Sequence, residues 1–408
     1  MLPQSYQKCL QGVLTPKQYV MVEILLTLLQ TRRDVRLERL AKYWTQAIQH
    51  DSRRRALQRF LLLPHLTPKL LWFALIKALI KQQYRQPGNH SQRRRQKKLT
   101  RLLKCNQMPL ILVIDRSQWR QRNLFMVGVA WQGRALPIDW QLLPKCGNSN
   151  LREQKALLTP VLRLLKGYQL LLVADREFHS PKLAEWLQQR GVDFALRQKR
   201  NVCIQQQPSQ DYQALGSLDI QPGARLFLRD IYSTKTHQSG SYHLAVRWQR
   251  GYRCPTQPEV WYILTSLPSY KATIAIFKLR FGIEPLFRDL KTGGYHIEHT
   301  HVSEPCFLAL VLLVAMAYTW TALQGLALRS QPDLALYLSR RPQPGRSQPH
   351  HSHFQLAFNA HLWQLDLPDC RALNAQLRAL NPHKRHFYER GLRAQSLLQS
   401  CFQPLVTL

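Results

Sequence analysis

Residues 111–115 read Ile-Leu-Val-Ile-Asp, and residues 171–175 read Leu-Leu-Val-Ala-Asp. Each is a short, continuous apolar run that ends in an aspartate, which is typical of a strand buried on both faces. The pattern places each carboxylate at the carboxyl end of its strand, where α/β sheets build their sites. An aspartate at a strand end can also be a turn residue or a helix cap, so each run alone is ambiguous.

The elements around these two runs predict the fold class. Strands are expected at 109–115, 124–131 and 134–141, then a helix at about 151–167, a strand at 169–175, a helix at 181–190 and a strand at 192–197. Three consecutive strands followed by alternating helices and strands predict a mixed α/β sheet with helices on its faces. This is the element order of a ribonuclease-H-like domain, with Asp115 on the first strand and Asp175 on the fourth. Two acids on neighbouring strands are a stronger functional signal than either acid alone.

The whole chain divides into four regions. Residues 1–100 read as a helical, basic DNA-binding region that ends in a polar, basic linker at 91–98. The ribonuclease-H-like domain is expected at 105–328, with β-rich patterning at about 200–270 that indicates an insertion. A Pro-rich linker at 329–353 then leads to a helical C-terminal region at 354–408. The apolar run at 306–328 is broken too early for a bilayer span, so we expect a buried core helix.

Composition points to a polyanionic partner. Lys and Arg number 58 against 23 Asp and Glu, which gives a net charge of +35. Such a charge works against compactness unless a polyanion offsets it. Basic residues are spread along the chain and interleaved with aromatics, which favours a long DNA path over a membrane patch. The eight cysteines form no Cys-x-x-Cys pair, and the chain opens without a signal peptide, so we expect a reducing cytoplasm and no membrane.

A third acid stands among basic residues at helical spacing. The residues at steps of 3, 4 and 7 are Phe277, Arg280, Glu284 and Lys291, which places all four on one helical stripe. Pro285 interrupts the pattern, so the helix is expected to start or bend near Glu284. Three converging carboxylates would bind a divalent metal, and a ligand set of oxygen atoms alone favours Mg²⁺ or Mn²⁺.

The spacing around this third acid resembles the DDE transposases of bacterial insertion sequences, specifically the group with a Tyr-Arg-Glu-Lys signature. Arg280, Glu284 and Lys291 match the positions of that signature, and Phe277 replaces its tyrosine. The stretches 115–117 (Asp-Arg-Ser) and 174–176 (Ala-Asp-Arg) look like the first two acid motifs of the family. The resemblance covers about 105–325, and a β insertion between the second and third acids is also a family trait.

The resemblance implies cut-and-paste transposition of DNA. In that reading Asp115, Asp175 and Glu284 are the catalytic residues and hold two Mg²⁺ ions about 3.5–4 Å apart, with Mn²⁺ able to substitute. One ion activates a water and later a 3′-hydroxyl, and the other stabilises the leaving oxygen. The implied partners are double-stranded DNA, as inverted-repeat ends and as target, and a second copy of the chain in a homodimer on paired ends. The implied location is the bacterial cytoplasm, at the nucleoid.

Eight residues are candidate DNA contacts: Arg280, Lys291, Phe277, Arg288, Trp261, Arg53, Arg54 and Arg55. The resemblance implies that Arg280 and Lys291 hold phosphates near the cut end. Family members often flip a base onto a tryptophan, which makes Trp261 and Trp248 candidates, although a tryptophan in a core strand is the alternative for both. The arginines 53–55 are equally compatible with a solvated basic face.

Several alternatives stay open on the sequence alone. The spacing His296-x-x-His299-x-His301 could hold zinc, but it lacks a cysteine and a fourth ligand, so solvated or DNA-facing histidines are favoured. Asp289 and Glu298 are possible third acids without the flanking Arg and Lys. The competing functions are a ribonuclease-H-like DNA nuclease without strand transfer and a domesticated DNA-binding protein with an inactive site. The presence of all three acids argues against the second.

Overall fold

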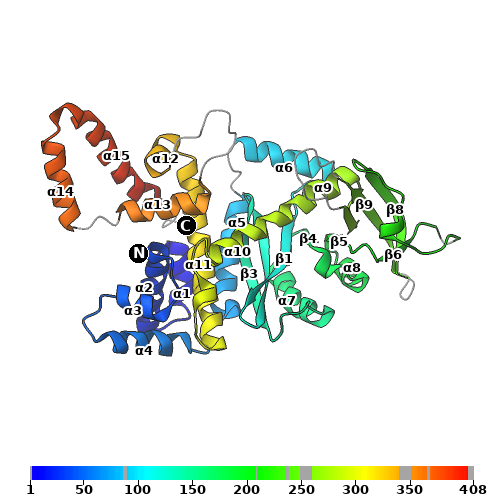
Figure 1. The fold of residues 1–408 in the computed structure, drawn as a ribbon, viewed down its shortest axis with the longest axis horizontal. Coiled ribbons are helices and arrows are strands. Elements are labelled where there is room, and N and C mark those ends of the chain that lie inside the picture. The colour runs from blue at the N-terminus through cyan, green and yellow to red at the C-terminus, as the bar shows by residue number, and fades with distance from the viewer. Residues whose placement is uncertain are drawn as a thin grey trace. The chain divides into compact units, whose positions relative to one another are not determined.

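The computed structural model describes residues 2–85, 90–207, 209–234, 239–248, 260–339, 351–364 and 368–402 (Figure 1). The chain divides into two compact units. The helical unit combines Met1–Lys81 with Asp289–Leu408, and the sheet unit is Gln82–Arg288.

A single mixed sheet forms the core of the sheet unit. In the described residues its ten strands have the order β3-β2-β1-β4-β5-β10-β9-β8-β6-β7. The first five strands are β1 Leu110–Trp119, β2 Arg122–Trp131, β3 Arg134–Leu143, β4 Leu170–Ala174 and β5 Asp193–Arg197. β2 pairs antiparallel with β1 and β3, whereas β4 runs parallel to both β1 and β5. All residues at 110–114 and 170–174 are buried, as expected for central strands. This confirms the predicted fold class.

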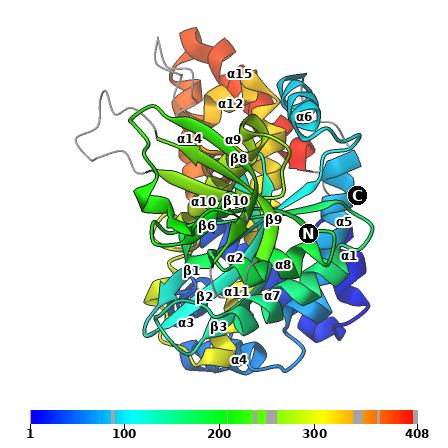
Figure 2. The same cartoon turned by 90° about the vertical axis from the view of Figure 1, so that its right-hand side faces the viewer.

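The predicted β insertion forms the outer half of the same sheet. Its strands are β6 Cys203–Gln205, β7 Gln213–Ala214, β8 Arg225–Ser233, β9 Ser239–Arg247 and β10 Trp261–Thr265. β10 pairs antiparallel with β5, with Ile263 opposite Arg197, and β9 and β8 follow outward. These outer strands lie at the right of Figure 1 and face the viewer in Figure 2. Residues 249–259 of the predicted insertion lie outside the described residues.

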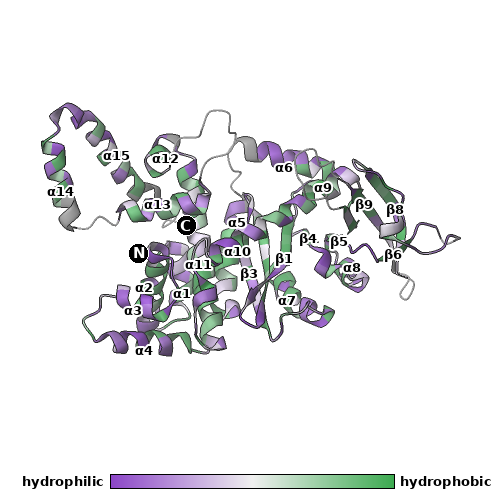
Figure 3. Cartoon of the chain, viewed as in Figure 1, coloured by the Kyte–Doolittle hydropathy of each residue, from purple (hydrophilic) through white to green (hydrophobic). Residues whose placement is uncertain are grey.

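The main helices of the sheet unit are α6 His90–Leu103, α7 Leu151–Leu164, α8 Pro181–Gln188 and α9 Tyr270–Phe277. The prediction of a linker at 91–98 was wrong, because α6 covers that stretch. The helix is mostly hydrophilic (Figure 3). Arg, Gln and Lys are good helix formers, and the buried Leu99 gives the helix an apolar anchor. α6 packs against α9.

The helical unit is organised around one long apolar helix, α11 Glu304–Arg329. Its length and composition would allow a membrane span, yet 94% of its most apolar window is buried inside the protein. The hydroxyl of Tyr6 donates a hydrogen bond to the Met316 carbonyl at 2.9 Å, which ties the N-terminal helix to α11. The prediction of a buried core helix here is confirmed.

The same unit contains shorter helices. They are α1 Gln4–Gln11, α2 Pro16–Arg32, α3 Leu37–Tyr43, α4 His50–Leu61, α12 Pro332–Leu338, α13 His353–Gln364, α14 Pro368–Ala379 and α15 Arg385–Phe402; α5 Phe73–Arg85 crosses the unit boundary. The predicted linker at 329–353 is in part helical, because α12 lies within it, and residues 340–350 are outside the described residues. Leu334 and Leu338 of α12, four residues apart, join a small core with Leu356 and Leu398. The N-terminal and C-terminal helices thus share one unit instead of forming separate regions.

Candidate active site

The register of the central strands places two acids side by side. β1 and β4 run parallel, with Ile114 opposite Ala174, so the next residues, Asp115 and Asp175, follow at equivalent positions. Asp115 lies within β1, and Asp175 directly follows β4 and caps the 3₁₀ turn Arg176–Phe178. The parallel pairing of two buried apolar runs therefore fixes the relative position of the two carboxylates.

The third acid follows a broken helix. α9 ends at Phe277, a 3₁₀ segment covers Lys278–Gly282, and α10 begins at Ile283 and runs to Leu290. Pro285 therefore stands in the first turn of α10, where a missing backbone N–H costs no helical hydrogen bond. At Gly282 an added Cβ would lie 2.6 Å from the Arg134 carbonyl oxygen, so only glycine allows this close approach to β3. Glu284 is consequently held in the first turn of a new helix.

Arg280 brings the three acids together. Its Nη1 lies 3.4 Å from Asp115 Oδ2 and 4.0 Å from Asp175 Oδ2, and its Nη2 donates to Glu284 Oε1 at 2.8 Å. The Arg280 side chain is 7% exposed, against 23% for Asp115, 29% for Asp175 and 56% for Glu284. Three carboxylates from distant parts of the chain thus surround one guanidinium.

Burial dominates the electrostatics of Asp115. It raises the pKa of Asp115 from its ordinary 3.8 to about 6. The hydrogen bond from the Arg116 amide (2.8 Å) and the positive charge of Arg280 oppose this rise, whereas nearby Asp175 adds to it. Asp175 has a second cation, because Arg197 Nη1 lies 3.2 Å from its Oδ1. Asp115 and Asp175 therefore lie in an anionic site that is partly neutralised by two arginines.

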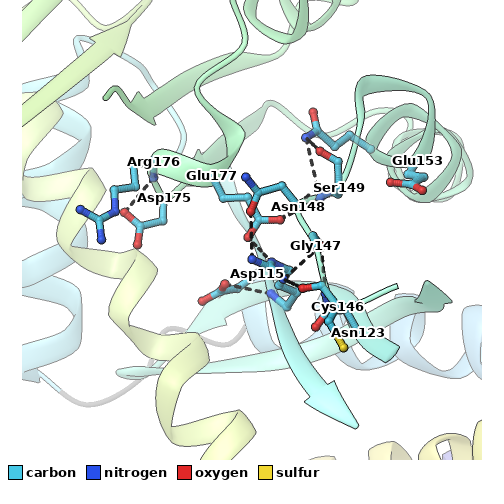
Figure 4. A network of polar contacts seen from close by, with 12 residues as sticks. Asp115, Asn123, Cys146, Gly147, Asn148, Ser149, Glu153, Asp175, Arg176 and Glu177 are labelled. Atoms are coloured by element: carbon cyan, nitrogen blue, oxygen red, sulfur yellow. Dashed lines mark hydrogen bonds and ion pairs between the residues drawn. The ribbon is translucent and has the colours of Figure 1, made fainter. Parts of the chain in front are cut away.

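A fourth acid, Glu177, completes the surroundings and was missed by the sequence analysis. It accepts hydrogen bonds from the backbone N–H and hydroxyl of Ser149, at 3.1 and 3.3 Å, and forms an ion pair with Arg116 (Figure 4). Arg116 directly follows Asp115, and Glu177 stands two residues after Asp175. The ion pair therefore links β1, beside Asp115, to the turn that follows Asp175. The sequence did contain a signal for this pair: a basic residue follows Asp115 and an acidic residue stands two positions after Asp175.

Arg116 also fixes the loop before α7. Its Nη1 donates to the Cys146 carbonyl at 2.9 Å and to the Gly147 carbonyl at 3.2 Å, and its Nη2 donates to Asn148 Oδ1 at 3.0 Å. The loop leads into a capping box in which Asn150 and Glu153 bond each other's backbone N–H at the start of α7. This network ties the loop before α7 to β1 beside Asp115.

The three acids offer the oxygen ligands that a hard divalent cation prefers. In the described residues no group of three or more His, Cys, Asp or Glu is arranged as a metal site, and the guanidinium of Arg280 contacts the three carboxylates instead. The donors are carboxylate oxygens alone, which suit Mg²⁺ or Mn²⁺. They already accommodate a positively charged group, so Asp115, Asp175 and Glu284 fit such an ion.

Aromatic side chains border Arg280. The Trp261 ring packs edge-on against Phe277, with centroids 5.4 Å apart, and lies 5.8 Å from the Phe281 ring. Arg280 stacks over Phe281, with 4.6 Å from its Cζ to the ring centroid, and Arg247 stacks over Trp261. Phe277 is 1% exposed, so in this conformation it supports Trp261 and has no surface to offer to DNA. Trp261 is half-buried, and its contact with DNA stays a prediction.

The other predicted DNA residues lie elsewhere. Arg288 is exposed at the end of the sheet unit, and Lys291 follows α10 in the helical unit. On α4, Arg53 donates to the Trp44 carbonyl, Arg54 pairs with Glu38, and Arg55 is exposed. The role of these five cations in DNA binding stays a prediction.

The alternative acids and the histidine cluster belong to the helical unit. Asp289 is buried there, where its charge interacts with Arg33 and Tyr295. The rings of His296 and His299 are 5.9 Å apart, yet no described metal-binding group includes them. These residues therefore give no support to a zinc site.

The strand order, with Asp115 within β1 and Asp175 directly after β4, defines a ribonuclease-H-like domain. Residues 110–320 match the family described as "Transposase DDE domain", which is more than half of the chain, and the protein belongs to this family. Among solved structures, one similar chain is that of a cryo-EM structure of the piggyBac transposase synaptic complex with hairpin DNA. The likeness covers 87% of this chain and 74% of that chain, with 10% identity and a TM-score of 0.45. No curated protein sequence matches the chain.

Proposed function

We propose that this protein is a transposase that binds the ends of a bacterial insertion sequence and catalyses metal-dependent DNA strand cleavage and strand transfer. The observation that carries the proposal is the convergence of Asp115, Asp175 and Glu284 on one cationic group in a chain of the transposase DDE-domain family. The spacing of Arg280, Glu284 and Lys291 favours the Tyr-Arg-Glu-Lys group, with Phe277 in place of the tyrosine.

In the proposed mechanism the protein chiefly positions groups and neutralises charge. Asp115 and Asp175, fixed by the pairing of β1 with β4, would hold two divalent cations together with Glu284 from α10. The chemistry supplied by such ions, when bound, is activation of a water or 3′-hydroxyl and stabilisation of the leaving oxygen. Arg116 and Glu177 would keep the two strand-end carboxylates in register during the reaction.

Basic surfaces would hold the DNA backbone. In α6 the residues Arg94, Arg95, Lys97, Lys98 and Arg101 are exposed, and no acid occurs between Asp51 and Asp115. Phosphate contacts of this kind give affinity that falls steeply with salt. Pairing of two DNA ends requires two active sites, so we propose that the working form is a homodimer.

The decisive experiment is cleavage of labelled duplexes that carry the inverted repeats from either side of the gene. We expect cleavage with Mg²⁺ or Mn²⁺ and none with EDTA. Asp115→Asn, Asp175→Asn and Glu284→Gln should each abolish cleavage and retain end binding. Glu185→Gln, an exposed acid on α8, is the matched control and should cleave normally. A Glu284→Gln protein that still cuts would contradict the assignment of Glu284.

A second assay separates the competing functions. A pre-cut end with a free 3′-hydroxyl, incubated with target DNA and Mg²⁺, is joined to the target by a transposase. A ribonuclease-H-like nuclease would cut the intact end and leave the pre-cut end unjoined. A domesticated DNA-binding protein would bind the ends and do neither.

A further inference from the structure

Arg280 is buried where a DNA-contacting arginine should be exposed. Its guanidinium reaches Asp115, Asp175 and Glu284, and its Nε is buried without an acceptor among the described residues. Resting on the proposed function, we propose that Arg280 is the internal counter-cation of the acidic site. It holds the three carboxylates together before metal binds, and it must leave them when metal binds.

The charges require such a cation. Three carboxylates around a single point repel one another, and two of them are removed from most of the solvent that would screen them. The Arg280 guanidinium spans all three because its two terminal nitrogens diverge: Nη1 faces Asp115 and Asp175, and Nη2 faces Glu284. A lysine has its three N–H donors on a single nitrogen, so it cannot reach partners on two diverging sides as the guanidinium does.

The same geometry makes metal and guanidinium competitors. The carboxylate oxygens Asp115 Oδ2 and Glu284 Oε1 lie 3.4 and 2.8 Å from Arg280 nitrogens, so a metal ion bound between these two oxygens would compete with the guanidinium for them. Among the described residues the Nε of Arg280 has no acceptor, and the guanidinium donates its hydrogen bonds to Asp115 and Glu284. Metal that neutralises the acids therefore removes the polar contacts of the guanidinium and leaves its stacking on Phe281.

The prediction is that Arg280 lowers the metal affinity of the DNA-free protein. Replacing it with glutamine keeps much of the side chain's bulk and removes the competing charge. We expect Arg280→Gln to bind Mn²⁺ about ten-fold more tightly than the wild type, which corresponds to about 1.4 kcal/mol. We also expect Mn²⁺ to raise the melting temperature of Arg280→Gln more than that of the wild type, because tighter binding to the folded state stabilises it more.

The experiment is Mn²⁺ titration by calorimetry, with melting curves, on the full-length protein without DNA. Lys278→Gln is the matched control, because Lys278 is exposed on the same 3₁₀ segment and its loss changes the net charge equally. The control should bind Mn²⁺ as the wild type does. If Arg280→Gln is not folded, Arg280→Lys replaces it, with an expected affinity between the wild-type value and ten-fold tighter binding.

The outcomes separate this inference from the proposed function. If the wild type binds Mn²⁺ and Arg280→Gln binds it equally or more weakly, the counter-cation role is wrong and the metal-dependent function stands. If Lys278→Gln shows the same gain, the effect is one of general charge and the inference is also wrong. If no variant binds Mn²⁺, both the inference and the proposed metal site fail.

Discussion

The raised pKa of Asp115 predicts that this residue destabilises the fold at neutral pH. A rise from 3.8 to about 6 corresponds to about 3 kcal/mol, since one pKa unit is about 1.36 kcal/mol. Between these two values the folded protein binds more protons than the unfolded chain, so its stability falls as the pH rises. The stabilising effect of the protonated form is complete below pH 4 and is lost as the pH passes through 6.

The perturbation that tests this is Asp115→Asn, which retains the shape and the acceptor for the Arg116 amide but cannot ionise. We expect the variant to be more stable than the wild type by up to about 3 kcal/mol at pH 8, and by nearly nothing at pH 3.5. The assay is urea denaturation without divalent metal, followed by circular dichroism across that pH range. A stability difference that does not change with pH would refute the reasoning, and so would a variant less stable than the wild type at pH 8.

Two further predictions concern the supports of the site. Gly282→Ala places a Cβ 2.6 Å from the Arg134 carbonyl oxygen. Because the 3₁₀ segment must then shift, we expect a loss of about 1–3 kcal/mol in stability and at least a hundred-fold slower cleavage. Melting curves and single-turnover kinetics measure the two effects. Cleavage at the wild-type rate would contradict the prediction. Arg116→Ala leaves Glu177 partly buried without its cation, and we expect a loss of about 1–3 kcal/mol, which Glu177→Gln in the same chain partly restores. A double-mutant cycle measures this, and strictly additive effects would mean that the ion pair is unimportant.

Local pattern was sufficient for the central sheet. The apolar runs before Asp115 and Asp175 predicted buried strands, and the short connections between them left few alternative topologies. The break near Glu284 followed from Pro285. These features were predictable because each depends on residues close together in the chain.

Other features depend on contacts that a single sequence does not show. The helical character of α6 was missed because its cations read as a solvated linker, while its apolar anchor is the buried Leu99. The ion pair of Arg116 with Glu177 joins residues 61 positions apart. The placement of Arg280 among the acids was equally hidden, because its spacing on the helical stripe suggested a side chain that faces DNA.

The return of β10 to the edge of β5 has a consequence for how such proteins vary and can be engineered. The chain leaves the central strands after β5, builds its outer strands and rejoins the same layer before α9. Residues can therefore be added to or removed from the outer strands without altering the route of the chain from β10 through α9 to Glu284. Sequence searches for related proteins should allow any number of residues between the second and third acids. A fluorescent reporter is best inserted at the outermost of these added strands.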